Sequence, residues 1–211
     1  MMLRRADTLF SAEDFRRRAL TEREEPERDF YGDHRLNPDS RDWVVRPDLR
    51  EAAVMITAVD HRDGATLILT KRADHLRKHA GQIAFPGGSI DPEDSSPEAA
   101  ALREMEEEIG LDPAAVEVLG RLPDYSTGSG FRIAPVLGIV QPGFSLSINP
   151  VEVDAVFEVP LAFLMDPANH ARNSLIFAER ERFFYEMPFG ERRIWGVTAG
   201  VIRTLYERLY A

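Results

Sequence analysis

The sequence contains no cysteine among its 211 residues. A thiolate nucleophile and a cysteine-based zinc site are therefore both excluded. With 44% hydrophobic residues, a chain of this length can bury a core of ordinary size without disulfides or a structural metal. We therefore expect one domain with an N-terminal extension.

Long hydrophobic runs are also absent, and none approaches the roughly 20 residues of a membrane-spanning helix. After Arg4 and Arg5 the N-terminus becomes polar and acidic, and it does not enter the apolar stretch of a signal peptide. We therefore expect a soluble, cytoplasmic protein with no membrane partner.

Positive charge is in short supply. The chain has 26 Lys and Arg against 36 Asp and Glu, which gives a formal net charge of -10 at pH 7. Broad binding to nucleic-acid phosphates needs a basic face, so this balance argues against a nucleic-acid partner. A polyanionic substrate would have to be met by local cations or by metal ions.

The first 50 residues are rich in charge and punctuated by proline, and we interpret them as an extension. A helix is predicted to start near Ser11, because Ser11 and Asp14 have approximately the spacing of a capping box. The remaining residues, 51–211, are predicted to form the main domain. If the extension does not pack on that domain, it could instead join a homodimer.

Hydrophobic periodicity and turn residues predict the elements of this domain. Strands are predicted at residues 52–59, 65–70, 83–85, 116–122, 131–140, 155–159 and 182–187, and helices at residues 96–109 and 197–210. The turn at Asp63-Gly64 predicts a β-hairpin, and Pro86-Gly87-Gly88 is predicted to end the third strand. Many strands with few helices predict an α/β fold in which helices cover a mixed sheet.

Residues 96–109, here called the glutamate helix, carry three carboxylates on one face. At about 100° per residue, Glu104, Glu107 and Glu108 fall within roughly 100° of arc, whereas the apolar residues occupy the other side. Like charges at this spacing repel, and the helix dipole disfavours anions near the C-terminus. A hard cation such as Mg²⁺ or Mn²⁺ would resolve the conflict. On charge pattern alone, a solvated acidic face with an Arg103–Glu107 pair remains equally open.

The segment before this helix adds glycines, which let backbone approach a metal or phosphate closely. From Gly88 to Leu111, ending in REMEEEIGL, the chain resembles the Nudix box and matches its second half completely. The first half departs from the signature: Asp94 stands in place of a glutamate, and eight residues instead of seven separate it from Arg103. Whether Asp94 contacts a metal or Arg103 is left open by the sequence.

This resemblance implies the Nudix fold, a mixed β-sheet sandwiched between helices (α/β/α). It implies that Glu104, Glu107 and Glu108 bind Mg²⁺ or Mn²⁺ and that Arg103 orients a carboxylate. Water would attack a phosphorus of a diphosphate, activated by the metal. Glu104 and Glu107 are then expected to be catalytic, with Glu104 also a candidate base. Glu152, in the loop before a strand, is the candidate for a further acid, although it could equally be a plain loop carboxylate.

Residues 71–79, here called the basic loop, form a local basic island in this acidic chain, with four Lys or Arg and two His. Just ahead of a diphosphate site, such cations are placed to hold additional phosphate groups. The alternative is a solubilising loop, and the neighbouring box favours phosphate binding.

The basic loop and its flanks also resemble the second signature of the coenzyme A diphosphatase branch of Nudix hydrolases. The match comprises Leu69, Thr70, Arg72, Leu76, Arg77, His79, Gly81, Gln82, Phe85, Pro86, Gly87 and Gly88. It implies hydrolysis of coenzyme A or its thioesters to 3',5'-ADP and 4'-phosphopantetheine. The residues that we expect to bind this substrate are Arg72, Arg77, His79, Gln82, Gly87 and Gly88.

Two alternatives accompany this prediction. A Nudix enzyme for another small nucleotide, such as ADP-ribose, NADH or a nucleoside triphosphate, would differ in pocket residues that the sequence does not locate. A non-catalytic Nudix-fold binding module is the other, and the intact Glu104, Glu107 and Glu108 argue against it.

Overall fold

The computed structural model describes residues 8–27, 29–177 and 179–211. Its framework is a nine-stranded mixed sheet and a separate three-stranded antiparallel sheet. The helices are α1 (Ala12–Ala19), α2 (Arg41–Val44), α3 (Pro97–Ile109), α4 (Leu161–Leu164) and α5 (Gly196–Leu209). Short 3-10 turns lie at Asp33–Arg35, Pro38–Ser40, Pro113–Ala115 and Pro167–Asn169. The strands of the large sheet are β1 (Tyr31–Gly32), β2 (Arg50–Val59), β3 (Thr66–Arg72), β4 (Ile83–Ala84), β5 (Gly87–Ser89), β6 (Val116–Arg121), β7 (Tyr125–Ser126), β8 (Phe131–Val140) and β9 (Val153–Pro160). The small sheet contains β10 (Ala171–Phe177), β11 (Arg180–Phe189) and β12 (Arg192–Trp195).

The large sheet is organised around β2 and β8, which pair in parallel along their full length of ten residues. The strand order is β1-β7-β8-β2-β3-β4, with β5 added to β2, β6 to β8 and β9 to β3. The predicted hairpin is confirmed, since β2 and β3 are antiparallel and Ala58 lies opposite Leu67. Most residues of β2 are buried, as expected of a central strand that is covered on both faces.

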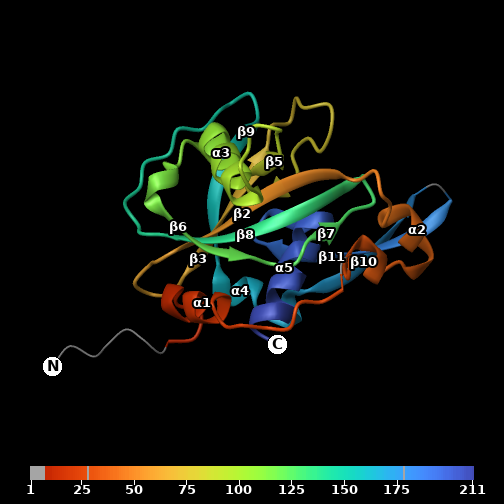
Figure 1. Cartoon of the computed structure of the whole chain (residues 1–211), viewed down its shortest axis with the longest axis horizontal. Helices are drawn as coiled ribbons and strands as arrows, with labels where there is room; N and C mark the ends of the chain where they lie inside the picture. The colour runs from red at the N-terminus through yellow and green to blue at the C-terminus, as the bar shows by residue number, and fades with distance from the viewer. Residues whose placement is uncertain (1–7, 28, 178) are drawn as a thin grey trace.

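Helices cover both faces of this sheet, which confirms the predicted α/β/α sandwich (Figure 1). On one face Met105 and Ile109 of α3 pack in a core with Met55 and Ile68 of the sheet. On the other face α5 and α1 share a second core with the sheet. The amphipathic pattern of the glutamate helix therefore has a physical cause: its apolar side is buried and its carboxylate side is left toward the site.

The N-terminal segment packs against this body. The predicted helix is confirmed as α1, where the Ser11 hydroxyl accepts from the Asp14 N–H at 3.1 Å and the Asp14 carboxylate accepts from the Phe10 N–H at 3.2 Å. Phe15 is fully buried in the core, and β1 pairs in parallel with β7. The boundary at residue 50 stays a prediction, but the described part of the segment contributes a strand and core residues to the fold.

The glutamate helix begins and ends where its sequence predicts. The Ser96 hydroxyl accepts from the Ala99 N–H at 3.2 Å, and Pro97 occupies the first turn, where it needs no hydrogen-bond partner. Gly110 ends the helix in the left-handed conformation, with φ of 67°.

Several features of the fold differ from the sequence-based prediction, among them the short elements β1, β7, α2 and α4, which were not predicted. Gly87 and Gly88 were predicted only to end a strand, but they form β5 and pair with Val54 and Ala53 of β2. The pairing continues at Pro86, whose carbonyl accepts from the Met55 N–H. Strands β10 and β12 were not predicted at all. Every residue of β10 is exposed, so its sequence carries no alternation between buried and exposed positions.

Gly87 permits this close pairing. A Cβ at position 87 would overlap the Ala53 carbonyl and lie 2.7 Å from the Val54 Cα, and the φ of 155° disfavours other residues. We therefore expect Gly87→Ala to lower the free energy of unfolding by about 3 kcal/mol in urea denaturation, from overpacking and backbone strain together.

Gly143 provides the control, since its φ of 99° is also positive but an added Cβ would meet nothing within 4 Å. Gly143→Ala should cost only about 1 kcal/mol, from strain alone. Equal losses for the two variants would contradict the importance of the Gly87 contact.

Candidate active site

Arg103 of α3 is the centre of a network of carboxylates that includes Asp94 from the loop before the helix. Its Nε and Nη2 donate to the two oxygens of Asp94 at 3.0 and 2.9 Å. Its Nη1 donates to Glu104 at 3.0 Å and to Glu107 at 3.1 Å, and Nη2 also donates to the Ser89 carbonyl at 3.2 Å. The bond to Arg103 lowers the pKa of Asp94. In this structure Asp94 therefore contacts Arg103.

Glu108 lies on the buried side of the same carboxylate face and is only 2% exposed. Its Oε1 is 3.5 Å from Nη1 of Arg72, and its Oε2 accepts from the Gly87 N–H at 3.3 Å. Burial raises the pKa of Glu108 to about 7, and the charges of Glu152 and Glu104 add to the rise. Arg72 and the Gly87 N–H oppose it. The effect of burial thus outweighs that of the nearby positive charge.

Glu104 lies between Arg103 and the β5 backbone. Burial raises its pKa, the bond to Arg103 lowers it, and the nearby charges of Glu107 and Glu152 raise it further. A Cβ at position 88 would overlap the Glu104 carboxylate, so Gly88 leaves the room in which this carboxylate lies.

Glu152 reaches this region from the loop before β9. Its backbone carbonyl accepts from the Ala73 N–H at 2.9 Å, and its side chain accepts from Nδ2 of Asn149 at 3.2 Å. Its charge acts on both Glu104 and Glu108. The fold therefore brings Glu152 close to the helix glutamates, although its role as an acid stays a prediction.

The donor chemistry of this region fits a hard divalent cation. The charged side chains that act on one another here are carboxylates, which are the ligands that hard cations prefer. Burial is the main cause of the raised pKa of Glu104 and of Glu108, and the neighbouring carboxylates add a smaller rise. Over residues 8–27, 29–177 and 179–211, no three carboxylate or imidazole side chains converge into a complete metal site. Arg103 holds Glu104 and Glu107, so a cation would compete with it for both.

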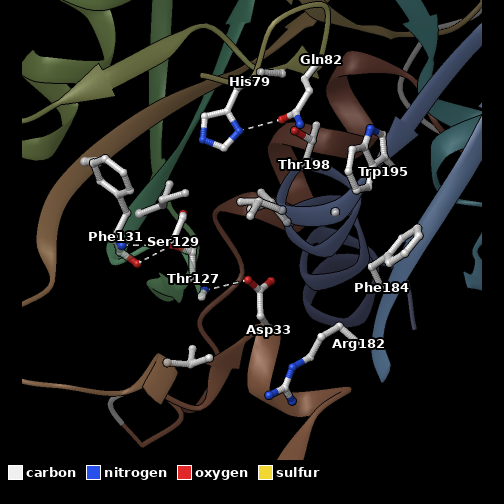
Figure 2. Close-up of a pocket in the computed structure, with 18 of the residues that line it drawn as sticks. Asp33, His79, Gln82, Thr127, Ser129, Phe131, Arg182, Phe184, Trp195 and Thr198 are labelled. Atoms are coloured by element: carbon white, nitrogen blue, oxygen red, sulfur yellow. Dashed lines mark hydrogen bonds between the residues drawn. The ribbon is translucent and has the colours of Figure 1, made fainter. Parts of the chain in front are cut away.

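A cleft of about 1020 Å³ opens beside the site. Five of the six predicted substrate-binding residues line it: Arg72, His79, Gln82, Gly87 and Gly88. Figure 2 shows His79 and Gln82 next to each other at one end, where Nδ1 of His79 is 2.9 Å from Oε1 of Gln82. Arg77 does not line the cleft and is exposed on the basic loop.

Much of the cleft wall comes from residues that the sequence did not indicate. We call the lining residues within 33–44 and 180–201 the outer wall. In Figure 2, Asp33 from the N-terminal segment faces Thr127. Phe184 projects from β11, and Trp195 lies directly before α5. These segments are far apart in the chain and join only through the fold.

A family model described as the NUDIX domain matches residues 49–179. The matched part includes the glutamate helix, the basic loop and the β5 glycines of the site just described. The chain therefore belongs to the Nudix hydrolases, a family of enzymes that cleave diphosphates, and its substrate is a nucleotide-like diphosphate. The family typically uses a divalent metal.

Curated relatives agree with this assignment. An Escherichia coli O7:K1 protein named "Uncharacterized Nudix hydrolase NudL" is 44% identical over 177 residues, which cover 79% of this chain and 90% of that protein. A protein of the same name from Shigella boydii serotype 4 is 43% identical with the same coverage. These names state the family and give no substrate.

Solved structures were also compared. The NUDIX domain of Shewanella oneidensis NrtR in complex with ADP ribose has a TM-score of 0.48 and 20% identity, covering 78% of this chain and 90% of that one. RenU, a Nudix hydrolase from M. smegmatis, has a TM-score of 0.47 and 22% identity, covering 56% and 74%. Both likenesses are too distant to inform the substrate.

No helix within the described parts of the chain is long and apolar enough to cross a membrane. The cytoplasmic location and the homodimer stay predictions.

Proposed function

We propose that this Nudix hydrolase cleaves the diphosphate bond of coenzyme A or acyl-CoA to give 3',5'-ADP and 4'-phosphopantetheine or its acyl thioester. The observation that carries the proposal is the placement of the second signature. Its residues Arg72, His79, Gln82, Gly87 and Gly88 line a single cleft, although they span 17 positions of the chain. Two of them, Arg72 and Gly87, also contact Glu108. These contacts support a single site shared by the signature and the glutamate helix.

In this proposal Glu104, Glu107 and Glu108 hold Mg²⁺ or Mn²⁺. When bound, the cation activates a water molecule and neutralises charge on the diphosphate oxygens. Water attacks one phosphorus, the bond to the bridging oxygen breaks, and that oxygen leaves with the other product. Glu152 takes the proton of the attacking water, or Glu104 does so in place of its ligand role.

Arginines and glycines of the chain hold the carboxylates in place and leave space where the diphosphate is proposed to bind. Arg103 holds Glu104 and Glu107 in place through one nitrogen, and Arg72 brings a positive charge to the cleft beside Glu108. Gly87 directs its N–H to Glu108, and Gly88 leaves room for the Glu104 carboxylate. His79 adopts the left-handed conformation with φ of 57°, a strained state that often marks a functional loop.

Arg77 is proposed to bind the 3'-phosphate of coenzyme A from the rim. It is exposed on the basic loop and outside the cleft, where a phosphate beyond the diphosphate would meet it. We expect Arg77→Ala to lower kcat/KM for coenzyme A by roughly tenfold, the loss of one charge-assisted hydrogen bond, and for 3'-dephospho-coenzyme A by much less.

Arg62 offers a matched control, because it is another exposed arginine that does not line the cleft. Arg62→Ala should change neither value. Equal losses for both substrates in Arg77→Ala would remove the 3'-phosphate role from this residue.

A substrate panel tests the proposed function as a whole. Coenzyme A, acyl-CoA, ADP-ribose, NADH and nucleoside triphosphates are each incubated with Mg²⁺ or Mn²⁺, and kcat/KM is measured. The proposal predicts the highest value for a member of the coenzyme A class. A clear preference for ADP-ribose, NADH or a triphosphate would replace it with that alternative, and turnover of none would favour the binding module.

A further inference from the structure

The outer wall lies outside the part of the chain that the family model matches. The model covers residues 49–179, whereas the outer wall comes from residues 33–44 and 180–201. The diphosphate end of the cleft, with Arg72, Gly87 and Gly88, lies within the matched part. The general chemistry and the outer wall are therefore supplied by different segments, and the outer wall is where this chain can select among diphosphates.

Two arginines of the outer wall, Arg180 and Arg182, each place a nitrogen near Asp39, at 3.6 and 3.1 Å. The neutral polar groups and the Asp33 carboxylate are paired within the protein. The Asp33 carboxylate accepts from the Gly128 N–H at 2.8 Å and from the Tyr125 hydroxyl at 3.0 Å. Asn37 donates to the carbonyls of Asp33 and Phe183, each at 2.9 Å, and accepts from the Phe183 N–H at 2.8 Å.

The same holds for the other polar groups that face the cleft here. The Trp43 indole N–H donates to the Gly128 carbonyl at 3.1 Å, so its ring is the part left for contact. The Thr198 hydroxyl donates to the Ile83 carbonyl at 2.9 Å, and the Ser40 hydroxyl donates to the Asn37 carbonyl at 2.7 Å. Away from Arg180 and Arg182, a ligand at this wall therefore meets few free hydrogen-bonding groups, which disfavours recognition of a nucleobase or a sugar there.

What remains is a set of apolar surfaces. Phe184 and Trp195 meet edge to face, with ring centroids 5.3 Å apart, and both line the cleft and are only partly buried. Val197 and Val201 of α5 line it beside them. Partly exposed aromatic rings next to aliphatic side chains bind a flexible hydrocarbon chain through the hydrophobic effect, without needing donors or acceptors.

We infer that the outer wall binds the acyl chain of a thioester substrate, so that the enzyme prefers acyl-CoA to free coenzyme A. This inference rests on the proposed function. The diphosphate occupies the end with Arg72 and Gly87, and the apolar arm runs along the cleft to Phe184 and Trp195. The volume of about 1020 Å³ exceeds what a diphosphate alone requires and is at the upper end of the usual size of ligand pockets.

The test compares kcat/KM for coenzyme A, butanoyl-CoA and octanoyl-CoA in the wild type and two variants. Burial of each methylene is worth roughly a fourfold change, so octanoyl-CoA should exceed coenzyme A by at least about tenfold in the wild type even if the chain is only partly buried. Phe184→Ala should lower the ratio of octanoyl-CoA to coenzyme A by about tenfold. Val197→Phe, which narrows the cleft without removing a wall, should shift the preference toward butanoyl-CoA.

Ile176→Ala is the matched control. Ile176 is an apolar residue of β10 that is 73% exposed and does not line the cleft, so the ratio should not change. Thermal melting shows whether each variant is folded. A wild-type ratio near or below one, or a ratio unaffected in both folded variants, overturns the inference while hydrolysis of coenzyme A still supports the proposed function. Failure to hydrolyse coenzyme A and all its thioesters, with turnover of another diphosphate, overturns the proposed function itself.

Discussion

Glu108→Gln is expected to lower metal-dependent hydrolysis roughly a thousandfold in kcat while the protein stays folded. A bound cation supplies several kcal/mol of charge stabilisation in the transition state, and each 1.36 kcal/mol is tenfold in rate. Glutamine keeps the shape of the side chain but removes the charge on which the cation depends. Steady-state kinetics over a range of Mg²⁺ or Mn²⁺ concentrations measures the effect.

The same substitution should stabilise the metal-free protein, which separates loss of charge from damage to the fold. The pKa of Glu108 is raised from 4.5 to about 7 by burial. A raised carboxyl pKa gives stability that is fully present below 4.5 and is lost as the pH rises through about 7. The loss is on the order of 3 kcal/mol, because one unit of pKa is worth 1.36 kcal/mol.

Urea denaturation between pH 4.5 and 8 in a chelator measures this. The wild type should lose stability over that range, and Glu108→Gln should lose less, so that at pH 8 it is the more stable protein. Adding the cation should stabilise the wild type and leave the variant unchanged.

Glu106→Gln is the control for both effects. Glu106 lies on the same helix, is exposed and is not among the predicted ligands, so its substitution should alter neither activity nor the pH dependence of stability. Full activity in Glu108→Gln, or equal effects in the two variants, would remove Glu108 from the site.

Arg103→Lys should reduce kcat by roughly a hundredfold with little change in KM. Arg103 bonds both oxygens of Asp94 while its third nitrogen holds Glu104 and Glu107, and a lysine ammonium does not reproduce this planar fork. Misplacement of a catalytic group by about 1 Å can cost a factor of this size. The predicted role is positioning, so the rate should change more than substrate binding.

A double-mutant cycle with Asp94→Asn tests this role. If Asp94 acts only by holding Arg103, the two substitutions together should cost little more than Arg103→Lys alone. Simple addition of the two effects would show that Asp94 has a separate function, such as direct metal binding. Arg121→Lys, at a half-exposed arginine with longer ion pairs of 3.8 and 3.9 Å, should leave kcat unchanged.

The glutamate helix was predictable because its signals are local. Ser96 and Pro97 begin it, Gly110 ends it, and the apolar side of the helix follows the 3.6-residue period, so no distant part of the chain is needed to define it. The long central strands were predicted for the same reason, since runs such as residues 131–140 are strongly apolar.

The outer wall could not be predicted, because its position depends on contacts between distant segments. Asn37 holds the backbone of Phe183, 146 positions away, and neither residue belongs to a pattern that a local reading detects. Strand β10 is exposed at every position and so lacks the alternation that predicts strands. The pairing of Asp94 with Arg103 likewise depends on how the loop before the helix folds back, which spacing alone left open.

The central claim is that cation-dependent hydrolysis of a coenzyme A compound takes place at the glutamate helix. Chromatographic identification of the products from coenzyme A and octanoyl-CoA, with and without Mn²⁺, tests it most directly for the wild type and Glu108→Gln. The account predicts 3',5'-ADP together with 4'-phosphopantetheine or its octanoyl thioester, formed only by the wild type and only with the cation. Cleavage at another bond, equal cleavage without the cation, or equal cleavage by Glu108→Gln would contradict it.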